Sequence, residues 1–140
     1  MTLKAAGGLN RITSRVIACG IVVHKTLGPG LLEAPYRLAL AVELARAGLA
    51  YEMEKPLTVM YGDARLGCGY RLDFVVEATV VVEIKSLAAV LPVHRAQLLT
   101  YLRLSGYPAG LLLNFNVPRL KDGIERVLND QPASEKDRRT

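Results

Sequence analysis

The residues of this chain best suited to chemistry are two carboxylates and an ammonium group carried by two neighbouring apolar segments. Asp73 lies within residues 71–76, and Glu83 and Lys85 lie within residues 80–85. Both segments are rich in Val, Ile and Phe, which favour β-strands, and the short break between them suits a hairpin. Charged groups inside such strands need partners, because burying an unpaired ion costs several kcal/mol.

The length of the hairpin loop decides whether the three charged groups share a face of the sheet. Side chains alternate along a strand, so Glu83 and Lys85 lie on one face in any register. A three-residue loop pairs Val76 with Val80 and places Asp73 opposite Glu83, whereas a two-residue loop sends Glu83 to the other face. The sequence leaves both registers open.

In the first register, the two carboxylates and the ammonium group converge. Like charges opposite each other destabilise a sheet, which favours a bound cation between them. Two hard oxygen ligands with open coordination positions suit Mg²⁺ or Mn²⁺, and Lys85 would hold or polarise a water beside the metal. The alternative is that Lys85 neutralises one carboxylate while the other lies at a solvated sheet edge.

Length and composition describe a globular protein. The chain has 140 residues, 51% of them hydrophobic and 22% charged, which fits a single domain with a real core. The formal net charge of +5 favours an anionic partner such as nucleic acid, although it would also promote solubility.

The chain also carries signals about its location. Its longest nearly uncharged run, residues 16–23, is too short to span a bilayer, and the N-terminus lacks the layout of a signal peptide. We therefore expect a cytoplasmic protein without a membrane partner. Cys19 and Cys68 are isolated, and we expect both to be buried thiols rather than a disulfide.

Periodicity and turn residues predict one α/β domain over residues 13–130, with helices and strands in the order α-α-β-β-β-α-β-α. The predicted segments are a flexible N-terminus (1–12), a helix (13–27), a helix from about 31 to 47 with Pro35 in its first turn, strands 51–61 and 66–76 around a turn at Gly62-Asp63, a strand (80–85), a helix (92–104) capped by Gly106, an internal strand (110–115), a helix (120–128) and a disordered tail (131–140).

The helix predicted at 92–104 carries a polar stripe. His94, Gln97 and Tyr101 are spaced i, i+3 and i+7, so all three project from the same side. This helix follows the strand of Lys85 by only a few residues, and it must pack near the strand ends. The stripe is therefore a candidate wall of the same site, the alternative being an ordinary solvated helix face.

Several ordered motifs together resemble a known family. Residues 30–36, Gly-Leu-Leu-Glu-Ala-Pro-Tyr, match the motif after which the GxxExxY protein family is named. The similarity covers roughly residues 15–128 and continues through residues 69–73, 82–85, 97–101 and 113–118. That family is placed in the PD-(D/E)XK nuclease-like superfamily, whose core is a helix, a three-stranded antiparallel meander, a helix and a further strand. The resemblance thus implies a central mixed sheet flanked by helices.

The resemblance also implies a role for each site residue. The metal ligands would be Glu33 on the early helix, Asp73, Glu83 and the carbonyl of Ile84. Lys85 would position water or stabilise charge. Gln97 and Tyr101 match the QxxxY helix motif, which lies beside the site and contacts the nucleic acid or the metal-bound water.

Other basic residues are candidates for contacts with the nucleic-acid backbone. Arg71 and Arg95 are expected to bind nucleic acid together with Tyr101, and Arg65 and Arg103 are further candidates. The alternative for each arginine is ordinary surface charge.

The function that follows is phosphodiester hydrolysis by a Mg²⁺- or Mn²⁺-dependent nuclease, with DNA the favoured substrate. A second hypothesis keeps the fold and the metal site in a catalytically weak or inactive binding or assembly protein. A third is a metal-binding homo-oligomer in which Glu33 and His24 support a different metal chemistry.

Overall fold

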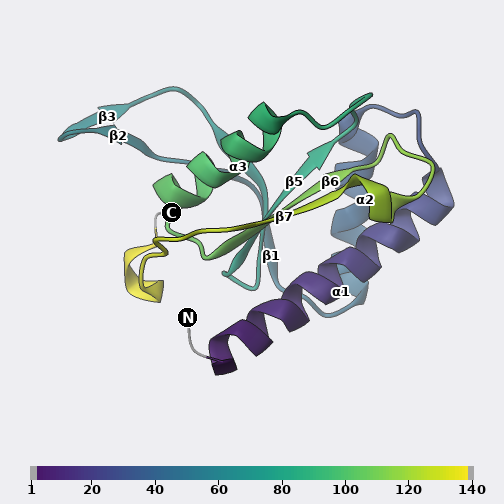
Figure 1. Ribbon diagram of the computed structural model, residues 1–140, viewed down its shortest axis with the longest axis horizontal. Helices are drawn as coiled ribbons and strands as arrows, with labels where there is room; N and C mark the ends of the chain where they lie inside the picture. Colours follow the sequence, from purple (N-terminus) through teal and green to yellow (C-terminus); the bar gives the residue numbers. More distant parts are fainter. Residues whose placement is uncertain (1–2, 139–140) are drawn as a thin grey trace.

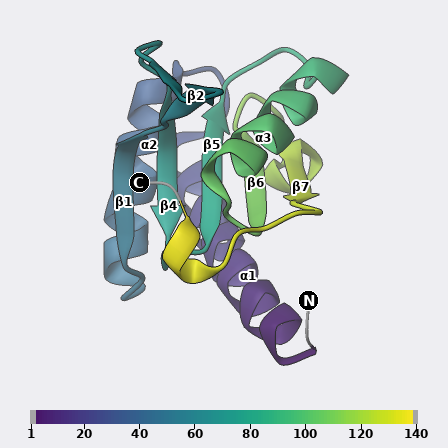
Figure 2. The same ribbon diagram turned by 90° about the vertical axis from the view of Figure 1, so that its left-hand side faces the viewer.

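The computed structural model describes residues 3–138, with side chains from residue 5 onward. Five strands form a mixed sheet in the order β1-β4-β5-β6-β7, in which β5 and β6 are parallel and the other neighbours antiparallel. Helices α1 and α2 cover one face and α3 covers the other (Figures 1 and 2). The predicted α/β architecture, an antiparallel meander plus a further strand between helices, is confirmed.

The elements follow one another along the chain with these bounds: α1 (Leu3–Leu27), α2 (Glu33–Arg46), β1 (Tyr51–Pro56), β2 (Val59–Tyr61), β3 (Ala64–Leu66), β4 (Arg71–Val76), β5 (Val80–Lys85), α3 (Pro92–Ser105), β6 (Ala109–Asn114), η1 (Leu120–Gly123), β7 (Ile124–Leu128) and η2 (Glu135–Asp137). The strand at 80–85, the internal strand β6 and the helix at 92–104 lie where they were predicted. Helix α2 begins at Glu33, so Pro35 falls in its first turn, as expected.

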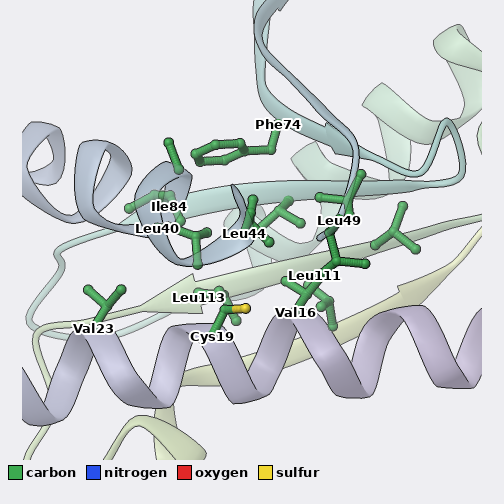
Figure 3. Packing of buried hydrophobic residues seen from close by; sticks show 14 of the residues in the cluster. Val16, Cys19, Val23, Leu40, Leu44, Leu49, Phe74, Ile84, Leu111 and Leu113 are labelled. Atoms are coloured by element: carbon green, nitrogen blue, oxygen red, sulfur yellow. The ribbon is translucent and has the colours of Figure 1, made fainter. Parts of the chain in front are cut away.

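The core has two parts, one on each face of the sheet. The larger part packs α1 and α2 against β4, β5 and β6, and Figure 3 shows Val16, Cys19 and Leu40 among its members. The smaller part lies under α3 and includes Val81, Leu98 and Leu112. Burial of apolar residues on both faces explains why β5 and β6 read as continuous hydrophobic runs rather than alternating ones.

Helix α1 is longer than the sequence indicated. It begins at Leu3, so the segment predicted to be flexible over 1–12 is helical wherever the structure describes it, and residues 1–2 lie outside that part. Leu9 is only 6% exposed and Ile12 packs against the same core. These two side chains extend the apolar stripe of α1 by nearly two turns, and their burial stabilises helix across Gly7 and Gly8.

The two strands predicted at 51–61 and 66–76 are each divided in two. Their outer parts, β1 and β4, pair in the main sheet, whereas β2 and β3 form a separate ribbon around the predicted turn at Gly62-Asp63. Pro56 ends β1, since it lacks the N–H that a continued ladder needs. The ribbon projects beyond α3 in Figure 1.

The prediction of a helix at 120–128 is wrong. Residues 120–123 form a short 3₁₀ turn, and β7 pairs antiparallel with β6 in a register that places Val127 opposite Gly110. A Cβ at Gly123 would lie 2.2 Å from the Asn114 carbonyl oxygen, so the chain can turn beside β6 only with glycine there. Pairing with β6 thus overrides the helical spacing of Ile124, Val127 and Leu128.

The C-terminal segment, predicted to be disordered over 131–140, is docked as far as residue 138. The Ala133 N–H donates to the Gly106 carbonyl at 3.0 Å, and Arg138 Nη1 donates to the Ala78 carbonyl at 2.7 Å. Residues 139–140 lie outside the described part of the chain. The expectation for the cysteines holds only for Cys19, because both thiols are free but Cys68 is exposed.

Candidate active site

The β4–β5 hairpin has the register that brings the charged residues together. Val76 pairs with Val80 across a three-residue loop, and the ladder continues through Phe74 and Val82. The next residues in this register are Asp73 and Glu83. The first of the two registers left open by the sequence is therefore the correct one.

At Asp73 and Glu83 the two strands separate. Side-chain carboxylates, rather than backbone carbonyls of the neighbouring strand, accept the hydrogen bonds of the backbone N–H groups here. The Asp73 N–H donates to Glu83 Oε1 at 3.2 Å, and the Ile84 N–H donates to Asp73 Oδ2 at 2.8 Å. Strand β4 also rotates here, because Leu72 packs in the core part under α3 whereas Phe74 packs under α1 and α2. Backbone donors thus fix one oxygen of each carboxylate.

Glu83 lies in an environment that opposes its ionisation. The residue is only 7% exposed, and its burial together with the nearby charge of Asp73 raises the pKa of Glu83 to about 8. The hydrogen bond from the Asp73 N–H and the charge of Lys85 act in the opposite direction. Near neutral pH the Glu83 carboxyl keeps its proton, and a cation that binds beside it would replace that proton.

The sequence did not indicate the basic residue that pairs with Asp73. Arg37, one helical turn after Glu33 in α2, places Nε 3.3 Å from Asp73 Oδ1 and Nη1 3.7 Å from Glu54 Oε1. Its Nε is buried and has no hydrogen-bond partner among the described residues. Glu54 lies opposite Asp73 in β1 and adopts a positive φ of 51°, so the backbone is strained at this point too.

Glu33, expected to be a third carboxylate ligand, does not join Asp73 and Glu83. Across residues 3–138, no three His, Cys, Asp or Glu side chains are grouped so that they could hold a metal ion. His24, named with Glu33 for a different metal chemistry, has its Nε2 2.7 Å from the Val117 carbonyl oxygen. Arg37 follows Glu33 by one turn, and it is the α2 residue that reaches Asp73.

The other conspicuous residues of the 30–36 motif have structural roles. Tyr36 is fully buried, stacks on Phe115 with a centroid separation of 4.6 Å, and donates its hydroxyl proton to the Gly28 carbonyl at 2.6 Å. The same hydroxyl accepts the Leu31 N–H at 3.1 Å. Gly30 has a φ of 103°, which a residue with a side chain rarely adopts. The motif therefore fixes the connection between α1 and α2.

A groove of about 680 Å³ adjoins the carboxylates and contains the predicted helix stripe. Lys85, Gln97 and Tyr101 line it together with Tyr70 and His94. Gln97 Nε2 donates to the Tyr101 hydroxyl at 2.9 Å. Burial raises the pKa of the Tyr101 phenol, and the charge of Glu83 acts in the same direction. The stripe is thus a wall of this site.

The arginines expected to contact nucleic acid have partners within the protein. Arg95 pairs with Glu125 at 3.2 Å, and Arg103 pairs with Asp130 at 3.3 Å. Arg71 donates to the Glu54 carbonyl at 3.2 Å, and Arg65 donates to the Thr58 hydroxyl at 3.3 Å. All four side chains are exposed, and their contact with nucleic acid stays a prediction.

The donor set fits a divalent cation that keeps part of its water shell. The Phe115 N–H donates a hydrogen bond to the Lys85 carbonyl at 2.9 Å. Because successive carbonyls of a strand point to opposite sides, the Ile84 carbonyl points toward the gap between β4 and β5. Asp73, Glu83 and this carbonyl supply hard oxygen ligands, two of them from carboxylates and one from a neutral carbonyl group. Mg²⁺ is commonly held by one or two carboxylates with waters in its remaining positions.

A mixed sheet between helices, with an acidic pair where two antiparallel strands separate and a lysine two residues further along, defines a nuclease-like α/β protein. A family model described as "PD-(D/E)XK nuclease superfamily" matches residues 10–127, so the chain belongs to that superfamily. The prediction of the superfamily is confirmed.

Other comparisons add little. A solved structure titled "Crystal structure of SSO0001" shares 24% sequence identity with a TM-score of 0.43, over 71% of this chain and 50% of that one, so this chain spans half the length of that protein. No curated protein matches the chain. Among the helices described here, none has the length and apolar character needed to cross a membrane.

Proposed function

We propose that the protein is a divalent-metal-dependent nuclease that hydrolyses phosphodiester bonds of nucleic acid, with DNA as the favoured substrate. The observation that carries this proposal is the pairing of Asp73 with Glu83 at the point where β4 and β5 separate. Lys85, on the same strand as Glu83, lines the adjoining groove. Membership of the PD-(D/E)XK nuclease superfamily supports the same chemistry.

Asp73, Glu83 and the Ile84 carbonyl would hold Mg²⁺ or Mn²⁺. The bound ion would supply an activated water and neutralise charge that develops on the phosphate. Glu83 must release its proton to act as a ligand, because burial and Asp73 raise its pKa. The hydrogen bonds from the Asp73 and Ile84 N–H groups hold both carboxylates in place for this role.

The remaining residues of the groove act on the substrate. The Lys85 ammonium is positioned to stabilise the negative charge that grows on the phosphate in the transition state. The hydrogen bond from Gln97 holds the Tyr101 hydroxyl at the edge of the carboxylate pair, where it can contact the nucleic acid. The Tyr70 ring, 5.8 Å from that of Tyr101, supplies a second aromatic surface for an unstacked base.

The decisive experiment is a cleavage panel on single-stranded, nicked, branched and duplex substrates with Mg²⁺ or Mn²⁺. Lys85→Ala should lower the cleavage rate by orders of magnitude and change affinity only slightly, because the lost charge acts mainly in the transition state. Lys136→Ala, on the exposed C-terminal segment, is the matched control and should cleave normally. Cleavage that survives in Lys85→Ala would mean that the activity belongs to another site or to a contaminant.

A second candidate is a metal- or nucleic-acid-binding protein with little or no turnover. The observation that favours it is the ion pair of Arg37 with Asp73, combined with the absence of Glu33 from the carboxylate group among residues 3–138. In that case no substrate would be cut faster by the wild type than by Asp73→Ala/Glu83→Ala. Calorimetry with Mn²⁺ would still show binding that either single alanine substitution abolishes.

We also infer membership of the GxxExxY group and a cytoplasmic location. The group is supported by residues 30–36, in which Gly30 and Tyr36 fix the loop before α2. The location is supported by the two free thiols, Cys19 and Cys68, which suit a reducing compartment. Assembly into a homo-oligomer stays a prediction, and sedimentation of the purified protein would test it.

A further inference from the structure

A second pocket lies where the end of α1 meets η1, outside the residues assigned above. Its volume is about 250 Å³, and three cationic side chains line it: Lys25 from α1, and Arg119 and Lys121 from the segment after β6. His24, only 7% exposed, forms part of its wall, with Nε2 2.7 Å from the Val117 carbonyl oxygen. Because a carbonyl oxygen can only accept, His24 donates through Nε2 and ties α1 to this segment.

The three cations are free to bind an external anion. All three side chains are exposed, and none belongs to an ion pair formed within residues 5–138. Arg95 and Arg103, by contrast, are paired with Glu125 and Asp130. An anion bound at this pocket would therefore interact with three positive charges, and no existing salt bridge would have to break.

The pocket lies at the same edge of the sheet as Lys85. The segment that carries Arg119 and Lys121 follows β6, whose last residue, Asn114, pairs with Lys85. The Phe115 N–H donates to the Lys85 carbonyl at 2.9 Å. Figure 1 shows the end of α1, η1 and the end of β5 together on the right-hand side.

The chain between α1 and α2 forms a second link across this edge. It begins at Gly28, three residues after Lys25. The carbonyl of Leu31 within it accepts a hydrogen bond from the hydroxyl of Ser86, the residue after Lys85. The pocket is thus joined to the catalytic strand by two packed connections. Its position relative to Lys85 is set by the fold rather than by a flexible tail.

We propose that Lys25, Arg119 and Lys121 bind backbone phosphates of the nucleic acid on one side of the bond to be cleaved. This inference rests on the proposed nuclease function and adds the path of the substrate, which runs from the groove beside α3 along the strand-end edge to the end of α1. Lysine and arginine that neutralise phosphates release counterions, so each contact contributes affinity that salt weakens.

The test is fluorescence anisotropy with short fluorescein-labelled duplex and single-stranded DNA, with EDTA present so that no cleavage occurs. The variant Lys25→Gln/Arg119→Gln/Lys121→Gln is compared with Arg11→Gln/Arg46→Gln/Lys136→Gln, which removes the same charge from exposed positions on other parts of the surface. Circular dichroism of both variants establishes that they are folded. A third variant, Lys25→Arg/Arg119→Lys/Lys121→Arg, keeps all three charges.

The pocket variant should bind DNA at least about tenfold more weakly between about 50 and 200 mM salt, and the slope of log K against log salt should fall by about 2 to 3. The control variant should change affinity less than about twofold, and the charge-preserving variant should bind like the wild type. Hydrolysis of bis(4-nitrophenyl) phosphate, too small to reach the pocket, should be the same in the wild type and in all three variants.

The outcomes separate the two proposals. Equal affinity and equal salt slope in the pocket and control variants would overturn the phosphate pocket while cleavage by the wild type upheld the nuclease. Binding that weakens as expected, in a protein that cleaves no substrate, would uphold the pocket and overturn the nuclease. A wild type that binds no DNA, but binds an acidic peptide or free phosphate through these residues, would overturn the pocket as a nucleic-acid site.

Discussion

Arg37 Nε lies 3.3 Å from Oδ1 of Asp73, the oxygen that is left free when Oδ2 accepts the Ile84 N–H. A divalent cation that binds Asp73 through this oxygen would meet the guanidinium group. The guanidinium group, fixed between Asp73 and Glu54, therefore occupies the position of a competing cation. In the metal-free site, Arg37 of α2 and not Lys85 alone therefore balances the negative charge of the carboxylates.

Replacing Arg37 by methionine should strengthen metal binding and lower the stability of the metal-free protein. Loss of the competing charge should tighten Mn²⁺ binding by about tenfold or more in calorimetry, because like charges a few ångströms apart repel strongly inside a protein. Loss of a partly buried ion pair should lower the free energy of unfolding in EDTA by about 1–2 kcal/mol. Arg46→Met, on the exposed end of the same helix, is the control. Weaker Mn²⁺ binding by Arg37→Met would show that the arginine holds Asp73 in its ligand geometry.

The raised pKa of Glu83, about 8 against an ordinary 4.5, predicts how stability depends on pH. Between these two values, the folded protein retains a proton that the unfolded chain has released, so this contribution is complete below pH 4.5 and is lost as pH rises through about 8. The metal-free protein should lose on the order of a few kcal/mol over this interval. Urea unfolding in EDTA across the interval measures this loss.

Glu83→Gln should flatten this pH profile, because its amide does not titrate. The wild type should in turn bind Mn²⁺ more tightly as pH approaches 8, since the metal must displace the Glu83 proton. Parallel pH profiles of the wild type and Glu83→Gln would place the shifted group elsewhere.

Tyr36→Phe tests whether the motif tyrosine is structural. Its hydroxyl donates to the Gly28 carbonyl and accepts the Leu31 N–H in a buried setting, so the substitution leaves both backbone groups without a partner. We expect a loss of about 1–3 kcal/mol in the free energy of unfolding. Tyr61→Phe, at a highly exposed tyrosine, should change stability by less than about 0.5 kcal/mol. Equal effects of the two substitutions would contradict the role assigned to Tyr36.

Ala78→Gly should stabilise the β4–β5 hairpin. Ala78 has a φ of 52°, a left-handed conformation that costs a residue with a Cβ about 1–2 kcal/mol. The greater freedom of glycine in the unfolded chain offsets part of this gain, which leaves a net stabilisation of up to about 1 kcal/mol. Thermal unfolding measures it, with Ala45→Gly in α2 as a control that should destabilise by about 1 kcal/mol. A lower melting temperature for Ala78→Gly would rule out strain at this turn.

The sequence was informative where a local rule decided the outcome. Strict alternation of side chains along a strand left two possible hairpin registers, and the structure has the one that places Asp73 opposite Glu83. The Gln97 and Tyr101 pair could likewise be assigned to one helix face from its spacing. Both arguments needed only backbone geometry: the structure selects one of the two registers and confirms that Gln97 and Tyr101 share a helix face.

Predictions failed where packing between distant segments decided the outcome. Arg37 contacts Asp73 only because α2 lies across the sheet at one particular angle, which no local pattern encodes. A helix would fit the spacing of Ile124, Val127 and Leu128 equally well. These residues form a strand because they pair with the edge of β6. The first turns of α1 are helical because Leu9 finds a core to pack against. In each case tertiary contacts outweighed the local preference.

The interruption of the β4–β5 ladder gives the protein two built-in reporters of its own chemistry. The amide hydrogens of Asp73 and Ile84 are held by carboxylate oxygens rather than by a neighbouring strand. Their exchange with solvent deuterium and their NMR chemical shifts therefore respond when a ligand displaces these carboxylate oxygens, whereas the amides of Val75 and Val81 follow opening of the sheet. Occupancy of the site can thus be observed directly at the backbone, without a substrate and without turnover.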